Sequence, residues 1–248
     1  MTPRMRSFRT VAARTAAAGA FAASLLGPAA QAEAAADRAG PPLAAIEEMI
    51  AMPGGAWRAA RGADGAVYFL SGNGRWVVRG EAYDLWQGER LGDFDAVRAS
   101  TRVIRLQGLG RIWEDLAPIA FGTGPEEIVV FTDPRCPVCE ALLGRLRAVA
   151  DRYRIVVLQI PLLGDASGRI VRAVHCAADA EAARAAVFDA RPATALTERP
   201  DCDGRPILRR LAAAQLIGLQ GVPFIIHGRD GRFIEGAPED LDAWLEGR

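Results

Sequence analysis

The chain has 248 residues, half of them hydrophobic, and its 30 basic and 30 acidic side chains leave no formal net charge at pH 7. That length is enough for one large domain or two small ones with a proper hydrophobic core. The balanced charge creates no overall positive field, which argues against a nucleic-acid-binding protein or one held electrostatically on an anionic membrane.

Residues 1–32 have the three-part pattern of a secretory signal peptide. The first part of the segment is basic and contains Arg4, Arg6, Arg9 and Arg14. An apolar stretch follows over residues 16–26, and then the small-residue sequence Ala30-Gln31-Ala32. The apolar stretch is shorter than the ~20 residues that a membrane span needs. We therefore expect cleavage after Ala32 and export to the periplasm; an uncleaved anchor is the alternative.

All four cysteines lie beyond this segment, as expected for a protein that folds in an oxidising compartment. Of the pairings that four cysteines allow, the spacing favours Cys136 with Cys139 and Cys176 with Cys202.

Residues 33–92 predict a small antiparallel domain. Residues 34–42 have the composition of a disordered lead-in, and residues 43–52 suggest a short amphipathic helix. Alternating apolar positions in residues 67–70 and 76–78 flank the turn sequence Asn73-Gly74, which is typical of a β-hairpin. Residues 80–86 continue as a further extended piece.

Residues 93–122 have a helical period and predict a linker, either as one long helix or as two short ones. Gly108 and Gly110 weaken a single helix in its middle. The sequence Gly122-Thr123-Gly124-Pro125 then marks a boundary, so we place the second domain at residues 123–248.

The second domain alternates strands and helices. Residues 128–131 and 154–160 are apolar runs typical of buried strands, with a helical pattern over 136–151 between them. A helical stretch over 166–219, interrupted at 191–206, leads to a strand (222–227), a turn (228–231), a strand (232–235) and a final helix (238–246). This order predicts a mixed α/β, thioredoxin-like domain with a helical insertion.

The segment before the second helix carries the chemistry. Cys136 and Cys139 stand two residues apart where a buried strand passes into a helix. Partial positive charge at a helix N-terminus stabilises a thiolate, so Cys136 should attack substrate and Cys139 should resolve the mixed disulfide. Pro137 suits the first helical turn. A zinc site is the alternative, but Cys176, Cys202 and His175 do not supply a second ligand pair at matching spacing, so we expect no metal and no cofactor beyond the cysteine pair.

Val222 and Pro223 form the second element of the predicted site. A proline at the start of an apolar strand is compatible with a plain edge position. In a thioredoxin-like fold this proline is cis and faces the cysteine pair, so that the backbone of Val222 binds an extended substrate. For Cys176 and Cys202 we expect a structural disulfide that closes a long loop, with a second redox pair as the alternative. His227 has no evident partner.

Several segments together resemble the periplasmic disulfide isomerases of the DsbC and DsbG type. They are Val130-Phe131-Thr132-Asp133 before the cysteine pair, His175-Cys176-Ala177 with Cys202, Gly221-Val222-Pro223, the C-terminal stretch from Gly236 to Leu245, and, nearer the N-terminus, Val67-Tyr68-Phe69 and Arg79 to Asp84.

This resemblance implies a V-shaped homodimer joined through a cystatin-like N-terminal dimerisation domain, with the catalytic domains facing an apolar cleft. It also implies a structural Cys176–Cys202 bond, misfolded or oxidised exported proteins as substrates, and a DsbD-type inner-membrane reductant for Cys136–Cys139.

The chain differs from the best-known isomerases at two positions that contact the sulfurs. It has Pro137-Val138 where they have Gly-Tyr, and Val222, as in DsbA-type oxidases, where they commonly have Thr. Both positions tune the reduction potential. We also expect Pro137 and Val138, together with Val222 and Pro223, to bind substrate. We therefore predict a disulfide isomerase or reductase, with a dithiol oxidase or client-specific thiol reductase as the redox alternative. A dimeric chaperone is the alternative of another class.

Overall fold

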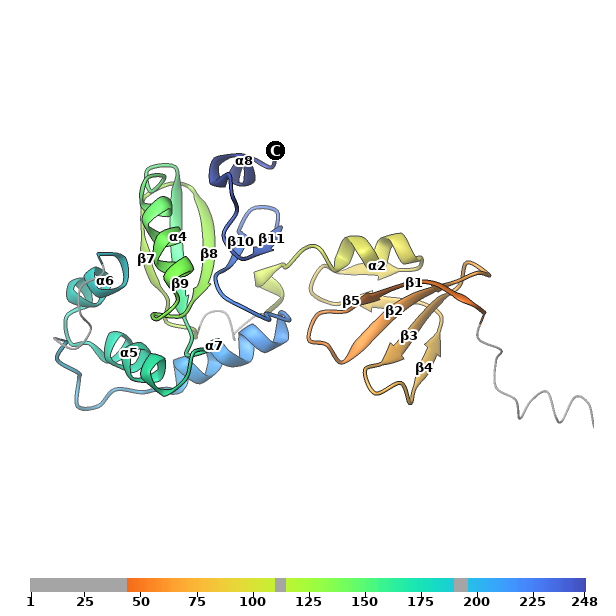
Figure 1. Ribbon diagram of the computed structural model, residues 1–248, viewed down its shortest axis with the longest axis horizontal. Helices are drawn as coiled ribbons and strands as arrows, with labels where there is room; N and C mark the ends of the chain where they lie inside the picture. Colours follow the sequence, from red (N-terminus) through yellow and green to blue (C-terminus); the bar gives the residue numbers. More distant parts are fainter. Residues whose placement is uncertain (1–43, 110–114, 190–195) are drawn as a thin grey trace, which may run out of the picture. The chain divides into compact units, whose positions relative to one another are not determined.

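The computed structural model describes residues 44–109, 115–189 and 196–248 (Figure 1). The predicted signal peptide (1–32) and lead-in (34–42) lie outside these ranges. Among the described residues, no helix is both long enough and apolar enough to cross a bilayer.

The N-terminal region is an antiparallel sheet with a short helix. Its strands β1 (Ile46–Ala51), β2 (Trp57–Gly62), β3 (Val67–Ser71) and β4 (Val77–Arg79) pair in sequence order, and β5 (Ala82–Asp84) forms a separate hairpin with β6 (Glu89–Leu91). Helix α2 (Phe94–Ser100) contributes Phe94 and Val97 to the small core of this region, which also contains Val67 and Phe69 of β3. The predicted hairpin at Asn73-Gly74 is confirmed as β3–β4.

Two sequence predictions for this region need correction or refinement. The helix predicted over residues 43–52 is wrong, because residues 46–51 form β1, which pairs with β2. Of the two alternatives for residues 93–122, the short elements are the ones observed: α2 is followed by a 3₁₀ turn, η1 (Leu106–Leu109), while residues 110–114 are not described.

The C-terminal region is a five-stranded mixed sheet in the order β11-β10-β8-β9-β7. Strands β8 (Glu126–Thr132) and β9 (Tyr153–Gln159) are parallel, whereas β7 (Ile119–Phe121), β10 (Phe224–His227) and β11 (Phe233–Glu235) pair antiparallel to their neighbours. Strand β7 precedes residue 123, so this sheet begins before the predicted boundary.

The alternating side chains of β8 face two different cores, which explains its continuous apolar sequence. Ile128 and Val130 pack in one core with residues of α4 (Pro137–Arg147) and α8 (Leu241–Glu246). Val129 and Phe131 pack in the other with residues of α7 (Arg205–Leu216). Helices α5 (Asp165–Cys176), α6 (Ala180–Phe188) and α7 stand between β9 and β10 in the chain. The fold is thioredoxin-like with a helical insertion, as predicted.

Candidate redox site

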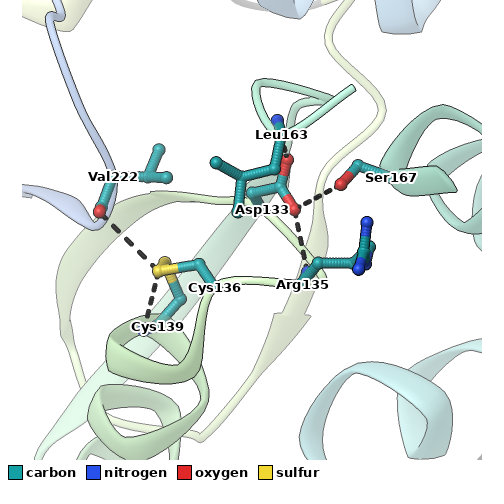
Figure 2. The surroundings of a disulfide bond; sticks show 7 residues. All are labelled: Asp133, Arg135, Cys136, Cys139, Leu163, Ser167 and Val222. Atoms are coloured by element: carbon teal, nitrogen blue, oxygen red, sulfur yellow. Dashed lines mark hydrogen bonds between the residues drawn. A yellow bond between two sulfur atoms is a disulfide. The ribbon is translucent and has the colours of Figure 1, made fainter. Parts of the chain in front are cut away.

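The Cys136–Cys139 pair lies where β8 passes into α4 (Figure 2). Cys136 is the N-cap residue of α4 and has extended backbone angles, and its Sγ accepts a hydrogen bond of 3.1 Å from the backbone N–H of Cys139. Pro137 occupies the first helical turn, where its missing N–H leaves no bond unmade. The exposed fraction falls from 8% at Cys136 to 1% at Cys139, which is the order expected for an attacking and a resolving cysteine.

The helix supplies the electrostatics that this chemistry needs. The free N–H groups at the start of α4 carry partial positive charge, and one of them already points at Cys136 Sγ. A thiolate formed at Cys136 is therefore stabilised relative to a thiol.

The peptide bond between Val222 and Pro223 is cis, and it comes directly before β10. The Val222 carbonyl oxygen lies 3.7 Å from Cys136 Sγ (Figure 2). The fold thus brings Val222 and Pro223 to the cysteine pair from a distant part of the sequence. Val138, the remaining residue predicted to bind substrate, is exposed beside the cysteines.

Asp133 is a residue of this site to which the sequence reasoning gave no role of its own. Its buried carboxylate accepts hydrogen bonds from the backbone N–H of Arg135 (2.8 Å), the backbone N–H of Leu163 (2.8 Å) and the hydroxyl of Ser167 (2.7 Å) (Figure 2). Its carbonyl oxygen accepts from the N–H of Cys136 at 3.1 Å. Asp133 therefore joins the redox loop to the loop after β9 and to the start of α5.

The loop after β9 presents two exposed leucines next to the redox loop. Leu162 and Leu163 are exposed although the loop backbone is fixed by the bond from Leu163 to Asp133 and by the bond from Ile160 N–H to the Thr132 carbonyl. Because β8 and β9 are parallel, their carboxyl ends meet at the same edge of the sheet. Exposed apolar surface thus lies beside the loop that leads into the cysteine pair.

The second disulfide joins Cys176, the last residue of α5, to Cys202. The Cys176 carbonyl accepts from the N–H of Arg199, and His175 Nε2 lies 2.8 Å from the Asp203 carbonyl. Burial is the main cause that lowers the pKa of His175. Within the described ranges, no group of three or more His, Cys, Asp or Glu side chains is arranged to hold a metal ion.

No family model and no curated protein matches the sequence. Solved structures do resemble the chain. A disulfide interchange protein from Neisseria gonorrhoeae is 21% identical over 53% of this chain and 94% of its own, with a TM-score of 0.46. The compact form of Proteus mirabilis ScsC is 17% identical over 60% and 83%, with a TM-score of 0.48. The thiol-disulfide exchange protein alpha-DsbA2 from Wolbachia pipientis is 17% identical over 57% and 93%, with a TM-score of 0.44. At these values, function has to be inferred from this chain's own residues.

Proposed function

We propose that the protein is a periplasmic thiol–disulfide oxidoreductase that isomerises or reduces disulfides in misfolded exported proteins. The observation that carries this proposal is the placement of Cys136 Sγ at the N-terminus of α4, opposite the carbonyl of a cis Val222–Pro223 bond. Neither feature is needed for a disulfide that only stabilises the fold.

The reaction follows from this placement. The Cys136 thiolate attacks one sulfur of a client disulfide, a bond forms between the two sulfurs, and the other client sulfur leaves as a thiolate. If a client thiolate then attacks the mixed disulfide, the client is isomerised and Cys136 is released. If Cys139 attacks Cys136 instead, the client leaves reduced and the Cys136–Cys139 bond forms. An inner-membrane dithiol of the DsbD type would restore the reduced enzyme.

The surface beside Cys136 favours polypeptide clients over small disulfides. Val138, Leu162 and Leu163 offer exposed apolar contact area, which a non-native chain with unburied side chains can cover. The backbone of Val222 can pair with the same chain as an added strand.

The proposal includes a homodimer formed through the N-terminal sheet. Within the described residues, β4 pairs with β3 on one side only, and Trp76, Val77 and Val78 are exposed there. An apolar edge strand of this kind is a site for pairing with a second copy. Two catalytic domains would then act on one large client.

A dithiol oxidase is the second candidate, because Pro137-Val138 and Val222 differ from the isomerase pattern at the positions nearest the sulfurs. In that case the Cys136–Cys139 disulfide would be passed to a reduced client, and the enzyme would end as the dithiol.

The deciding experiment is the refolding of a scrambled multi-disulfide protein in glutathione buffer with the mature chain and with its Cys136→Ser variant. The proposal predicts that the parent chain restores client activity and the variant does not. Rapid oxidation of a reduced client, with no rescue of the scrambled one, would support the oxidase. Suppression of client aggregation that persists when both active-site cysteines are replaced would support a chaperone.

A further inference from the structure

A cavity of about 550 Å³ adjoins the resolving cysteine. Its walls come from the ends of β8 and β9 and from α4 and α6, and both Cys136 and Cys139 reach it. Along α4, Glu140, Gly144 and Arg147 line it as a single stripe, since residues three and four apart share a helix face. Glu140 and Asp189 of this lining are exposed, so the cavity connects a buried sulfur to solvent.

Two polar side chains in the wall have buried atoms without a hydrogen-bond partner in the described part of the chain. They are the Thr132 hydroxyl and the Gln159 side-chain carbonyl, both on residues less than a tenth exposed. Thr132 and Gln159 are direct partners across β8 and β9, so they stand side by side. Buried polar atoms are normally bonded to protein or to ordered water, and a water molecule takes up roughly 30 Å³. The cavity is therefore large enough to bring several waters to both groups.

Gly144 is the third observation. Glycine in the middle of a helix is unfavourable relative to alanine. At this position an added Cβ would meet no heavy atom within 4 Å, so close packing does not require glycine. Because residue 144 has no large side chain, this part of the α4 wall stays open to the cavity.

If the proposed function is correct, Cys139 needs a route for its proton, and the inference below rests on that function. When Cys139 resolves a mixed disulfide, its thiol must lose a proton although its side chain is almost completely buried. We infer that the cavity is the hydrated proton path of Cys139, with water held by the Thr132 hydroxyl and the Gln159 amide as the proton acceptor.

The step balances as follows. The proton of the Cys139 thiol passes to water in the cavity and from there to bulk solvent on the side of Glu140 and Asp189. The Cys139 thiolate attacks Cys136 Sγ, the Cys136–Cys139 bond forms, and the bond from Cys136 to the client sulfur breaks. The client sulfur leaves as a thiolate and takes its proton from solvent. Thr132 and Gln159 act through water and are positioning residues.

The test separates attack by Cys136 from resolution by Cys139. The reduced full-length mature chain is mixed with dithiobis-nitrobenzoate, whose aryl thiolate is released once when Cys136 attacks and a second time when Cys139 resolves. Stopped-flow absorbance follows both phases as a function of pH for the parent and for a Thr132→Val, Gln159→Met double variant. Valine and methionine keep the approximate shapes and remove the groups that bind water.

We expect the first phase to be unchanged. The second phase should slow about tenfold at neutral pH, with its pH midpoint raised by about one unit. Equal second phases in parent and variant would overturn the inference while leaving the proposed function intact. A parent chain without the first phase would instead refute the proposed function.

A second pair of variants keeps the test decisive if the double variant loses its first phase through misfolding. Gly144→Leu narrows the cavity, whereas Gly144→Ala gives a similar gain in helix propensity with little added volume. The inference requires that Gly144→Leu slows only the second phase and that Gly144→Ala does not. Identical second phases in these two variants would overturn it.

Discussion

The two disulfides of this chain span similar Cα–Cα distances but lie at opposite ends of their helices. Their Cα–Cα distances are 5.2 and 5.4 Å, and Cys136, Cys139 and Cys176 are all buried. Cys136 caps the N-terminus of an α-helix, whereas Cys176 is the last residue of one. The helix macrodipole therefore stabilises a thiolate at Cys136 and destabilises one at Cys176.

The backbone segments around the two disulfides also differ. Cys136 faces the carbonyl of a cis peptide bond, and the loop that carries the exposed Leu162 and Leu163 is bonded to Asp133, three residues before Cys136. Cys176 is enclosed by pairing of its own segment, since the Arg199 N–H binds its carbonyl and Ala177 forms a β-bridge with Glu198. The candidate redox bond and the expected structural bond therefore differ in two features. These are the end of the helix at which the cysteine lies and the hydrogen bonding of the backbone beside it, whereas Cys136 and Cys176 are both buried and the Cα–Cα distances are similar.

The largest expected difference between the two disulfides is in exchange activity. Cys136→Ser should reduce thiol–disulfide exchange to the uncatalysed level, because it removes the nucleophile at the N-cap of α4 that attacks the client. A Cys176→Ala, Cys202→Ala double variant should keep exchange near the parent rate. Initial rates of reduction of a fluorogenic disulfide peptide measure both. Loss of exchange in a well-folded Cys176→Ala, Cys202→Ala variant would make the second bond part of the redox system.

Stability should show the reverse pattern. The Cys176–Cys202 bond has a sequence separation of 26 residues, and its removal should lower the free energy of unfolding by roughly 3–4 kcal/mol in the chain-entropy model. The separation across Cys136–Cys139 is only 3 residues, so a Cys136→Ser, Cys139→Ser variant should lose less. Urea denaturation followed by circular dichroism measures each difference. A larger loss for the active-site pair would reverse the assignment of roles.

The apolar surface next to Cys136 sharpens the contrast further. Leu162→Ser with Leu163→Ser should slow the reduction of an unfolded polypeptide about thirtyfold, because each of the two leucines covered by a client contributes about 1 kcal/mol. Reduction of oxidised glutathione should be unchanged. Leu208→Ser is the matched control, since Leu208 is a leucine of α7 that is 66% exposed, compared with 43% and 49% for the two loop leucines. Equal effects on both substrates would remove the loop from client binding.

The parts of the fold that sequence predicts well are those whose local pattern and tertiary role agree. The run from β8 through Cys136 to α4 has a buried strand, an N-cap and a proline in the first turn, and each points to the same structure. Residues 46–51 are the opposite case. Ile46, Met49 and Ile50 fit a helical face, but pairing with β2 overrides this pattern. Strand β2 is rich in Ala and Arg, and the neighbours on both sides hold it in the sheet.

Some residues of the candidate site could be predicted from the sequence, and others could not. Cys136, Cys139 and Pro223 have sequence signals, because the chemistry dictates their type and spacing. Ser167, Gln159 and Leu163 have none, since only the parallel pairing of β8 with β9 and the start of α5 bring them to the redox loop. Asp133 did have a sequence signal, because it stands three residues before Cys136 and directly after the end of a buried strand.

The smallest expected effect is on the pH dependence of stability, and it concerns the surroundings of the Cys176–Cys202 bond. The pKa of His175 is lowered, mainly by burial, below the ordinary value of 6.5. The unfolded chain therefore binds a proton at a pH where folded His175 remains neutral, so the free energy of unfolding is at its full value above about pH 6.5 and falls as the pH drops below it. His175→Gln should flatten this acid slope. Urea denaturation at pH values from about one unit above the ordinary pKa of histidine to about one and a half units below it measures the slope.

His227 provides the control for that experiment, because it is the other histidine of the chain and burial lowers its pKa as well. His175 is adjacent to Cys176 and approaches the Asp203 carbonyl. Its contribution to the pH dependence of the free energy of unfolding should therefore become smaller when Cys176 and Cys202 are replaced by alanine. The contribution of His227 to this pH dependence should not change. If His175→Gln leaves the slope as steep as in the parent, acid sensitivity resides at His227, and the two disulfides differ in redox chemistry and stability alone.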